Sequence, residues 1–251
     1  ATLLRKPSLV FSDTEHARLH HQLTVPFATN IFTPACYRID LGKKQIRFNS
    51  YMELSYLHPN YFTPDPAVLD MLGVGAADSF VIFRFVSWAA AHDFGHTGMS
   101  LENKRKAVVE ISQHARVFIS SEGALPDDLE KYRIQIPFNK IHDALFYSTL
   151  LFGESATMAS EAAVLGTPAI FLDNDGRGYT DEQERRYHIV YNFTESEQDQ
   201  QRALSCALEI LKDEKTRSKY KKIRTDILRE CEDTTAYMVN QVLKFNPGGK
   251  H

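Results

Sequence analysis

A polar cluster near the middle of the chain has residue types that could bind a charged ligand. Glu154, Ser155 and Thr157 follow a glycine, and Glu161 lies one to two helical turns further along. Ser155 or Thr157 is placed to cap a helix, whose free backbone N–H groups would favour an anion such as a pyrophosphate. A carboxylate at Glu161 can accept two hydrogen bonds from a ribose diol. The same spacing also fits a structural crossover with an N-cap and a surface glutamate.

The elements around this cluster form one strand–helix–strand unit. An apolar run over residues 144–152 ends at Gly153, and a helix is expected over 158–165. Gly166 and Pro168 end that helix, and a second apolar strand covers 169–172. Such a unit places the cluster in the turn between the first strand and the helix.

Strands and helices alternate along the rest of the chain. Further strands are expected over residues 7–11, 30–33, 44–48, 80–86, 115–119, 133–136 and 189–191, and helices over 17–23, 67–72, 101–114, 126–132, 141–148, 198–211, 216–229 and 234–243. Residues 51–66 are rich in Tyr, Pro and His and are expected to be a loop-rich connector. The alternation predicts an α/β fold with a mostly parallel sheet that is covered on both faces.

Composition narrows the class of protein. The chain has 251 residues, of which 43% are hydrophobic and 24% charged, as in ordinary globular proteins. A net charge of −3 gives no basic field for nucleic acid. No apolar run reaches the length of about 18 residues that a membrane span needs. Cys36, Cys206 and Cys231 are isolated, which favours a reducing, cytoplasmic compartment and argues against a disulfide framework or a cysteine zinc site.

Two motifs together resemble a known family. Residues 141–172 look like the nucleotide-binding half of GT-B enzymes such as the non-hydrolysing UDP-GlcNAc 2-epimerases and the UDP-GlcNAc transferase of peptidoglycan synthesis. More closely still, the chain resembles a GT-B-like family of unknown function from bacteria and archaea. That family pairs an Asp-x-Glu-His-Ala motif with a Thr-Met-x-x-Glu-Ala-Ala-x-Leu-Gly-Thr-Pro motif, and this chain has them at residues 13–17 and 157–168.

The resemblance implies a GT-B fold made of two Rossmann-like domains. Residues 1–66 would be the remainder of the N-terminal domain and a connector, and residues 67–235 the C-terminal nucleotide-sugar-binding domain. Residues 236–251 would form a closing helix and tail. Because a GT-B enzyme needs two such domains and the first is short here, we expect the N-terminal domain to be incomplete.

The resemblance also implies which residues bind the nucleotide. Glu161 would hold the ribose hydroxyls, and Ser155, Ala156 and Thr157 would hold the diphosphate at the helix start. Arg84, at the carboxyl end of a strand, sits where GT-B relatives place phosphate-facing residues. A surface arginine is the alternative.

Two further segments would complete the nucleotide-sugar site. Phe138 and its neighbours precede a helix, where relatives grip the base through backbone groups. The loop 173–178, with Asp175 and Arg177, should face the sugar, although its glycines are equally typical of a structural turn.

Proton transfer would fall to residues 13–17. Glu15 resembles the glutamate of the His-x-Glu-Ala-Gly motif of the epimerases, but the order here is Asp-Thr-Glu-His-Ala, so the match is partial. Glu15, His16 and Asp13 lie at a strand end, where a doubly wound fold binds its ligands. There a Glu and a His could move a proton, or Asp13 and His16 could simply be fixed by loop hydrogen bonds.

Two histidine pairs have metal-like spacing. His16 with His20 and His92 with His96 are each four residues apart, which places two rings on one helix face. Neither pair has the glutamate of a HExxH motif, so no metal is expected, and a role for His92 and His96 beside the sugar or phosphate is favoured.

The sequence therefore predicts an enzyme that acts on a nucleotide-diphospho-sugar, with a UDP-sugar as first choice of substrate, in glycan or polysaccharide biosynthesis. Glycosyl transfer to an unknown acceptor is the leading reaction, and no cofactor is required. The alternatives are 2-epimerisation of UDP-GlcNAc and nucleotide-sugar binding without turnover. A homodimer is compatible with the sequence.

Overall fold

The computed structural model describes residue 4 and residues 6–16, 18–86, 97–121 and 123–245. By its internal contacts the chain divides into two compact units. The first unit contains residues 1–62, 177–179 and 227–251, and the second contains residues 63–176 and 180–226. Both units therefore combine segments that are far apart in the sequence.

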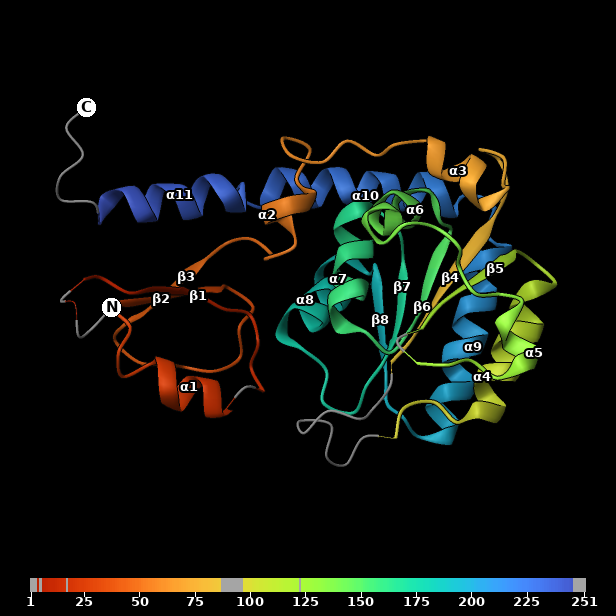
Figure 1. Cartoon of the computed structure of the whole chain (residues 1–251), viewed down its shortest axis with the longest axis horizontal. Coiled ribbons are helices and arrows are strands. Elements are labelled where there is room, and N and C mark those ends of the chain that lie inside the picture. The colour runs from red at the N-terminus through yellow and green to blue at the C-terminus, as the bar shows by residue number, and fades with distance from the viewer. Residues whose placement is uncertain (1–3, 5, 17, 87–96, 122, 246–251) are drawn as a thin grey trace. The chain divides into compact units, whose positions relative to one another are not determined.

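The first unit is built on a three-stranded parallel sheet in the order β1-β2-β3 (Figure 1). Its strands are β1 Leu9–Phe11, β2 Asn30–Pro34 and β3 Gln45–Phe48, and its helices include α1 Arg18–Thr24, α2 Leu54–Leu57 and α11 Thr234–Lys244. The Phe11 and Phe32 rings stack with their centroids 4.7 Å apart. Tyr237 of α11 stacks on Phe48 at 5.0 Å, so aromatic contacts attach the last helix to the sheet.

The second unit is a five-stranded parallel sheet in the order β5-β4-β6-β7-β8 (Figure 1). The strands are β4 Phe80–Phe85, β5 Arg116–Ser121, β6 Leu150–Gly153, β7 Ala169–Leu172 and β8 Val190–Phe193. The helices are α3 Ala67–Leu72, α4 Leu101–Ser112, α5 Asp127–Glu130, α6 Ile141–Tyr147, α7 Ala156–Leu165, α8 Gly178–Tyr187, α9 Glu197–Lys212 and α10 Thr216–Glu230, with residues 178–179 of α8 and 227–230 of α10 in the first unit. The strand order reverses between β4 and β6, and ligands of doubly wound sheets bind outside the carboxyl ends at such a point.

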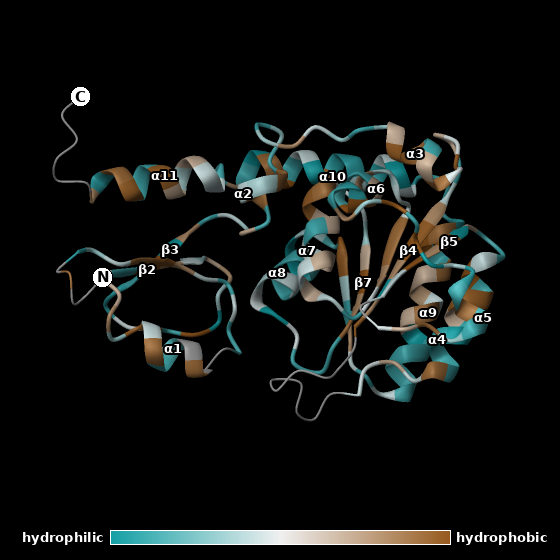
Figure 2. Cartoon of the chain, viewed as in Figure 1, coloured by the Kyte–Doolittle hydropathy of each residue, from teal (hydrophilic) through white to brown (hydrophobic). Residues whose placement is uncertain are grey.

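The core of the second unit lies on both faces of its sheet. Helices α4 and α9 cover one face, and α6 and α7 cover the other. Strands β6 and β7 are buried at every position, and the strands are the most hydrophobic elements in Figure 2. A parallel sheet with two covered faces needs such apolar runs.

The structure confirms the predicted α/β class with parallel sheets and differs in three segments. Residues 133–136 form a single bridge, between Ile119 and Arg133, instead of a strand. The expected connector contains the short helix α2. The loop that was expected to end at residue 178 leads directly into α8, whose buried stripe of Tyr179, Gln183 and Tyr187 is too polar for a hydropathy pattern to find.

A buried carboxylate ties together the ends of three elements in the second unit. Glu154 follows β6, and its side chain is fully buried. It accepts hydrogen bonds from the backbone N–H of Val86 at 3.0 Å and of Met99 at 2.6 Å, and Lys104 of α4 lies 3.0 Å away. Next to it, a side chain at Gly153 would collide with the Arg84 carbonyl, so only glycine lets β6 approach β4 here. The carboxylate thus fixes the ends of β4 and β6 against the start of α4.

We expect Glu154→Gln to lower the free energy of unfolding by about 3–5 kcal/mol, because it leaves Lys104 without its buried counter-charge. The amide would also turn a donor toward a backbone N–H. Urea denaturation measures the change. Glu209→Gln, at an exposed position of α9, is the matched control and should shift stability by less than about 0.5 kcal/mol. Equal losses in the two variants would refute a structural role for the buried charge.

Candidate functional site

The start of helix α7 is a candidate anion-binding position. Ser155 is the N-cap, since its hydroxyl accepts a hydrogen bond from the N–H of Met158 at 3.3 Å. Thr157 lies inside the helix with an exposed side chain, and Ala156 is the first helical residue. The first turn contains no acidic residue. The positive end of the helix dipole therefore has no carboxylate in its first turn to offset it.

Glu161 of α7 is buried and meets a histidine. Its Oε1 lies 2.9 Å from the Nε2 of His142, in α6. The packing of α6 on α7 brings together these two residues from distant parts of the sequence. His142 was missed by the sequence analysis because nothing in its local pattern distinguishes it. It holds the carboxylate in one orientation.

A cavity of about 450 Å³ lies at the carboxyl ends of β4 and β5; we call it the carboxyl-end cavity. Arg84, at the end of β4, lines it and donates a hydrogen bond to the Ser120 hydroxyl at 3.1 Å. Phe138 is 99% exposed and also lines it. Met158 adds the first turn of α7. The structure thus brings Arg84, Phe138 and the start of α7 together, with Arg133 as a second cation.

The loop after β7 is shaped by a residue that the sequence analysis did not single out. The buried carboxylate of Asp173 accepts hydrogen bonds from the N–H groups of Asp175, at 2.6 Å, and Gly176, at 3.1 Å. This is an Asx-type turn, in which a side chain organises its own following backbone. Asp175 is exposed in the second unit, whereas Arg177 belongs to the first unit.

In the first unit, Glu15 is a buried carboxylate that binds backbone. Its Oε1 accepts from the N–H of Arg38 at 2.5 Å, and its Oε2 accepts from the N–H of Gly178 at 3.0 Å. A side chain at Gly178 would collide with Glu15 and with the Cys36 carbonyl. Both oxygens of Glu15 are therefore used to hold loops together.

Asp13 and Tyr37 lie in the same region of the first unit. Burial raises the pKa of the Asp13 carboxyl above its ordinary value, and the neighbouring charge of Glu15 adds to this. Burial also raises the pKa of Tyr37 to about 12, helped by the nearby carboxylates. The Tyr37 hydroxyl lies 2.9 Å from the Nε2 of His21. The sequence analysis missed Tyr37 and His21, which the fold of the loop brings next to the Asp13–Ala17 motif.

Only one of the two histidine pairs lies within the described residues. His16 is exposed in a turn ahead of α1, which begins at Arg18. His92 and His96 lie outside the described residues. Within the described ranges, no group of three or more His, Cys, Asp or Glu side chains is placed to hold a metal ion. In the same ranges no helix combines the length and apolar character needed to cross a bilayer.

Solved structures share the fold of this chain. A candidate UDP-N-acetylglucosamine 2-epimerase from Listeria monocytogenes has a TM-score of 0.60 at 14% identity, over 96% of this chain and 67% of that chain. HepE from Anabaena, solved with UDP and glucose, has a TM-score of 0.57 at 14% identity, over 97% and 73%. A variant of the wall teichoic acid polymerase TagF has a TM-score of 0.52 at 14% identity, over 93% and 62%. These likenesses confirm the predicted GT-B-type fold, and at this identity they concern the fold alone.

The sequence itself matches a family. No curated protein matches the chain. A family model described as "Protein of unknown function (DUF354)" matches residues 2–246, which is nearly the whole chain. The protein therefore belongs to the DUF354 family.

Proposed function

We propose that this protein binds a nucleotide-diphospho-sugar, with a UDP-sugar as first choice, and transfers the sugar to an acceptor in glycan or polysaccharide biosynthesis. The carboxyl-end cavity carries the proposal. It lies where doubly wound sheets bind ligands, and two arginines and the start of α7 line it. The fold shared with HepE, which was solved with UDP and glucose, supports the same ligand class.

The diphosphate would lie against the start of α7 and Arg84. Ser155 holds the helix start in shape, and the N–H groups of Ala156 and Thr157 would donate to the phosphate oxygens. Phe138, which is fully exposed, offers an aromatic surface beside the base. As the bond to the sugar breaks, negative charge grows on the diphosphate, where these donors and the guanidinium stabilise it.

Glu161 would bind the ribose hydroxyls. Its partner His142 is a side chain and can turn away when two hydroxyls offer hydrogen bonds to the carboxylate. Asp175 and Arg177 remain our proposed contacts to the sugar. The ligand is bound without any metal or cofactor in this proposal.

The acceptor would be activated from residues 13–16. Both oxygens of Glu15 hold backbone N–H groups, so we assign Glu15 the role of positioning this loop. His16 is exposed and is the proposed base toward the acceptor, since imidazole is the commonest general base. Asp13 would stabilise the imidazolium that forms.

Epimerisation at the sugar is the second candidate, because one of the matched folds is a candidate UDP-N-acetylglucosamine 2-epimerase. The products distinguish the two reactions. Transfer releases free UDP and leaves the sugar on the acceptor, and slow hydrolysis releases UDP and the free sugar, whereas epimerisation gives the epimeric sugar nucleotide.

Glu161→Ala should weaken UDP binding by about tenfold or more, since a charge-assisted hydrogen bond contributes about 1.5–3 kcal/mol. Isothermal titration calorimetry with UDP, GDP and CDP measures this and ranks the bases. Glu209→Ala, exposed on α9, is the control and should bind like the parent. Thermal denaturation shows that both variants are folded. No binding of any nucleotide to the parent protein would refute the proposed function.

His16→Ala should slow UDP release from a UDP-sugar by about 10²–10⁴-fold, because a general base contributes that much, while UDP affinity stays unchanged. Release by slow hydrolysis is measurable by a coupled assay before the acceptor is known. His114→Ala, at an exposed site after α4, should keep the parent rate. Loss of UDP binding in His16→Ala would assign this residue to binding instead.

Asp13→Asn should make the protein more stable near neutral pH. The raised pKa means that folding favours the protonated acid, a contribution present below the unfolded pKa of 3.8 and lost as pH rises through the folded value. The gain from Asn should therefore grow between pH 4 and pH 7. Urea denaturation at both pH values measures it, with the exposed Asp70→Asn as control. If the gain in free energy of unfolding is the same at both pH values, the charge of Asp13 does not destabilise the folded protein.

A further inference from the structure

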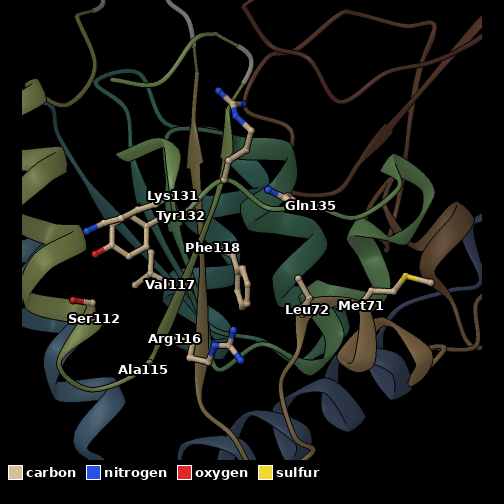
Figure 3. A pocket seen from close by; sticks show the side chains of 11 residues that line it. Met71, Leu72, Ser112, Ala115, Arg116, Val117, Phe118, Lys131, Tyr132 and Gln135 are labelled. Atoms are coloured by element: carbon tan, nitrogen blue, oxygen red, sulfur yellow. The ribbon is translucent and has the colours of Figure 1, made fainter. Parts of the chain in front are cut away.

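A second cavity, of about 500 Å³, lies along the outer edge of the sheet in the second unit (Figure 3). We call it the edge cavity. It runs beside the first half of β5, whereas the carboxyl-end cavity lies at the other end of that strand. Its walls are the end of α3, the end of α4 and the segment 131–135. The lining residues are Met71, Leu72, Ser112, Ala115, Arg116, Val117, Phe118, Lys131, Tyr132, Arg133 and Gln135.

The exposed edge of β5 faces this cavity. The N–H of Arg116 bonds inward to Ser79, ahead of β4, and the N–H of Ile119 bonds outward to the Tyr132 carbonyl. Because successive residues of a strand alternate in direction, Val117 shares the outward direction of Ile119. Its N–H and C=O therefore point to the edge that the cavity follows. This gives the cavity a backbone donor and acceptor.

The lining is positively charged. It contains Arg116, Lys131 and Arg133 and no Asp or Glu. Arg116 donates to the Gly73 carbonyl and lies 5.6 Å from the centroid of the Phe118 ring. Among the described residues these two partners are neutral, so they do not offset the charge of the guanidinium.

The charge of Lys131 is likewise not offset by a carboxylate in the lining. Its ammonium lies 5.0 Å from the centroid of the Tyr132 ring. Asp128 is near enough to interact electrostatically with Lys131, but it forms an ion pair with Arg105 at 2.8 Å. Arg133 has a carboxylate partner in Glu130, which lies outside the lining. The cavity therefore attracts anions.

An apolar wall lies next to these cations. In Figure 3, Met71 and Leu72 lie on one side of β5 and Lys131, Tyr132 and Ser112 on the other, with Phe118 and Arg116 between them. Met71 is 49% exposed although it is large and apolar. A ligand that fits both parts has an anionic group and an apolar body.

We infer that the edge cavity binds a small organic anion, in which a phosphate or carboxylate is joined to an apolar or aromatic body. The volume lies in the range of about 300–1,000 Å³ that small-molecule sites occupy. The anion would lie between Arg116, Lys131 and the N–H of Val117, and the body on Met71, Leu72 and Phe118. Arg133 lines both cavities, but this inference does not depend on the proposed function, because Arg116, Lys131 and Val117 do not line the carboxyl-end cavity.

Titration of the ¹⁵N-labelled protein with phenyl phosphate, benzoate and phenol tests the inference by TROSY NMR. Phenyl phosphate should give saturable shifts at the amides of Val117, Lys131 and Gln135, and benzoate shows whether a carboxylate suffices. Phenol has the ring without the charge and should bind much more weakly. The shifts should persist in Glu161→Ala, which separates this site from the nucleotide site.

Lys131→Gln should weaken phenyl phosphate binding by roughly fivefold, the effect of one exposed charge of about 1 kcal/mol. Lys222→Gln, at an exposed position of α10, removes a cation outside the lining and should leave the affinity unchanged. Arg116→Gln also removes the bond to Gly73, so it serves as a second variant only if its thermal midpoint is retained. Absence of saturable shifts at these amides, equal binding of phenol, or parent affinity in Lys131→Gln would overturn the inference.

Discussion

The buried charge of Glu154 is the constraint on which the ligand-facing end of the second unit depends. A carboxylate without contact to water is tolerated only when hydrogen bonds and a counter-charge replace its hydration. Val86, Met99 and Lys104 supply these from the end of β4 and from the start of α4. The next residue, Ser155, caps α7. One charge therefore sets the position of two strand ends and of the helix start that we propose binds the diphosphate.

The residue types of α7 are explained mainly by close packing. All residues of α7 from Met158 to Leu165 are buried, because the helix is enclosed by the sheet on one side and by α6 on another. Alanines allow this close approach, and Gly166 ends the helix in a left-handed conformation with φ of 85°. Most of the motif over residues 157–168 thus specifies close packing. Within the motif we propose a side-chain contact to the ligand for Glu161 alone, and the N-cap Ser155 lies just ahead of it.

The sequence predicts those parts of the fold that depend on local pattern. The helix over residues 67–72 ends at Gly73 as expected, because a left-handed glycine is a strong local signal. The apolar strands of the second unit are equally clear. Residues 133–136 were mistaken for a strand because Ile134 and Ile136 alternate with polar residues, but these side chains line the carboxyl-end cavity instead. The pair of His142 and Glu161 depends on the packing of two helices, which no local pattern contains.

The buried carboxylates differ in the hydrogen-bond partners that the structure gives them. Glu15, Glu154 and Glu195 all accept hydrogen bonds from backbone N–H groups, and those donors cannot leave without unfolding the loops that carry them. Glu161 instead meets the side chain of His142, which is half-buried and can rotate at the small cost of a changed rotamer. A ligand hydroxyl can take the place of such a partner, whereas it cannot displace the backbone. This difference supports our proposal that Glu161 binds the ribose, although it is almost as buried as the other three carboxylates.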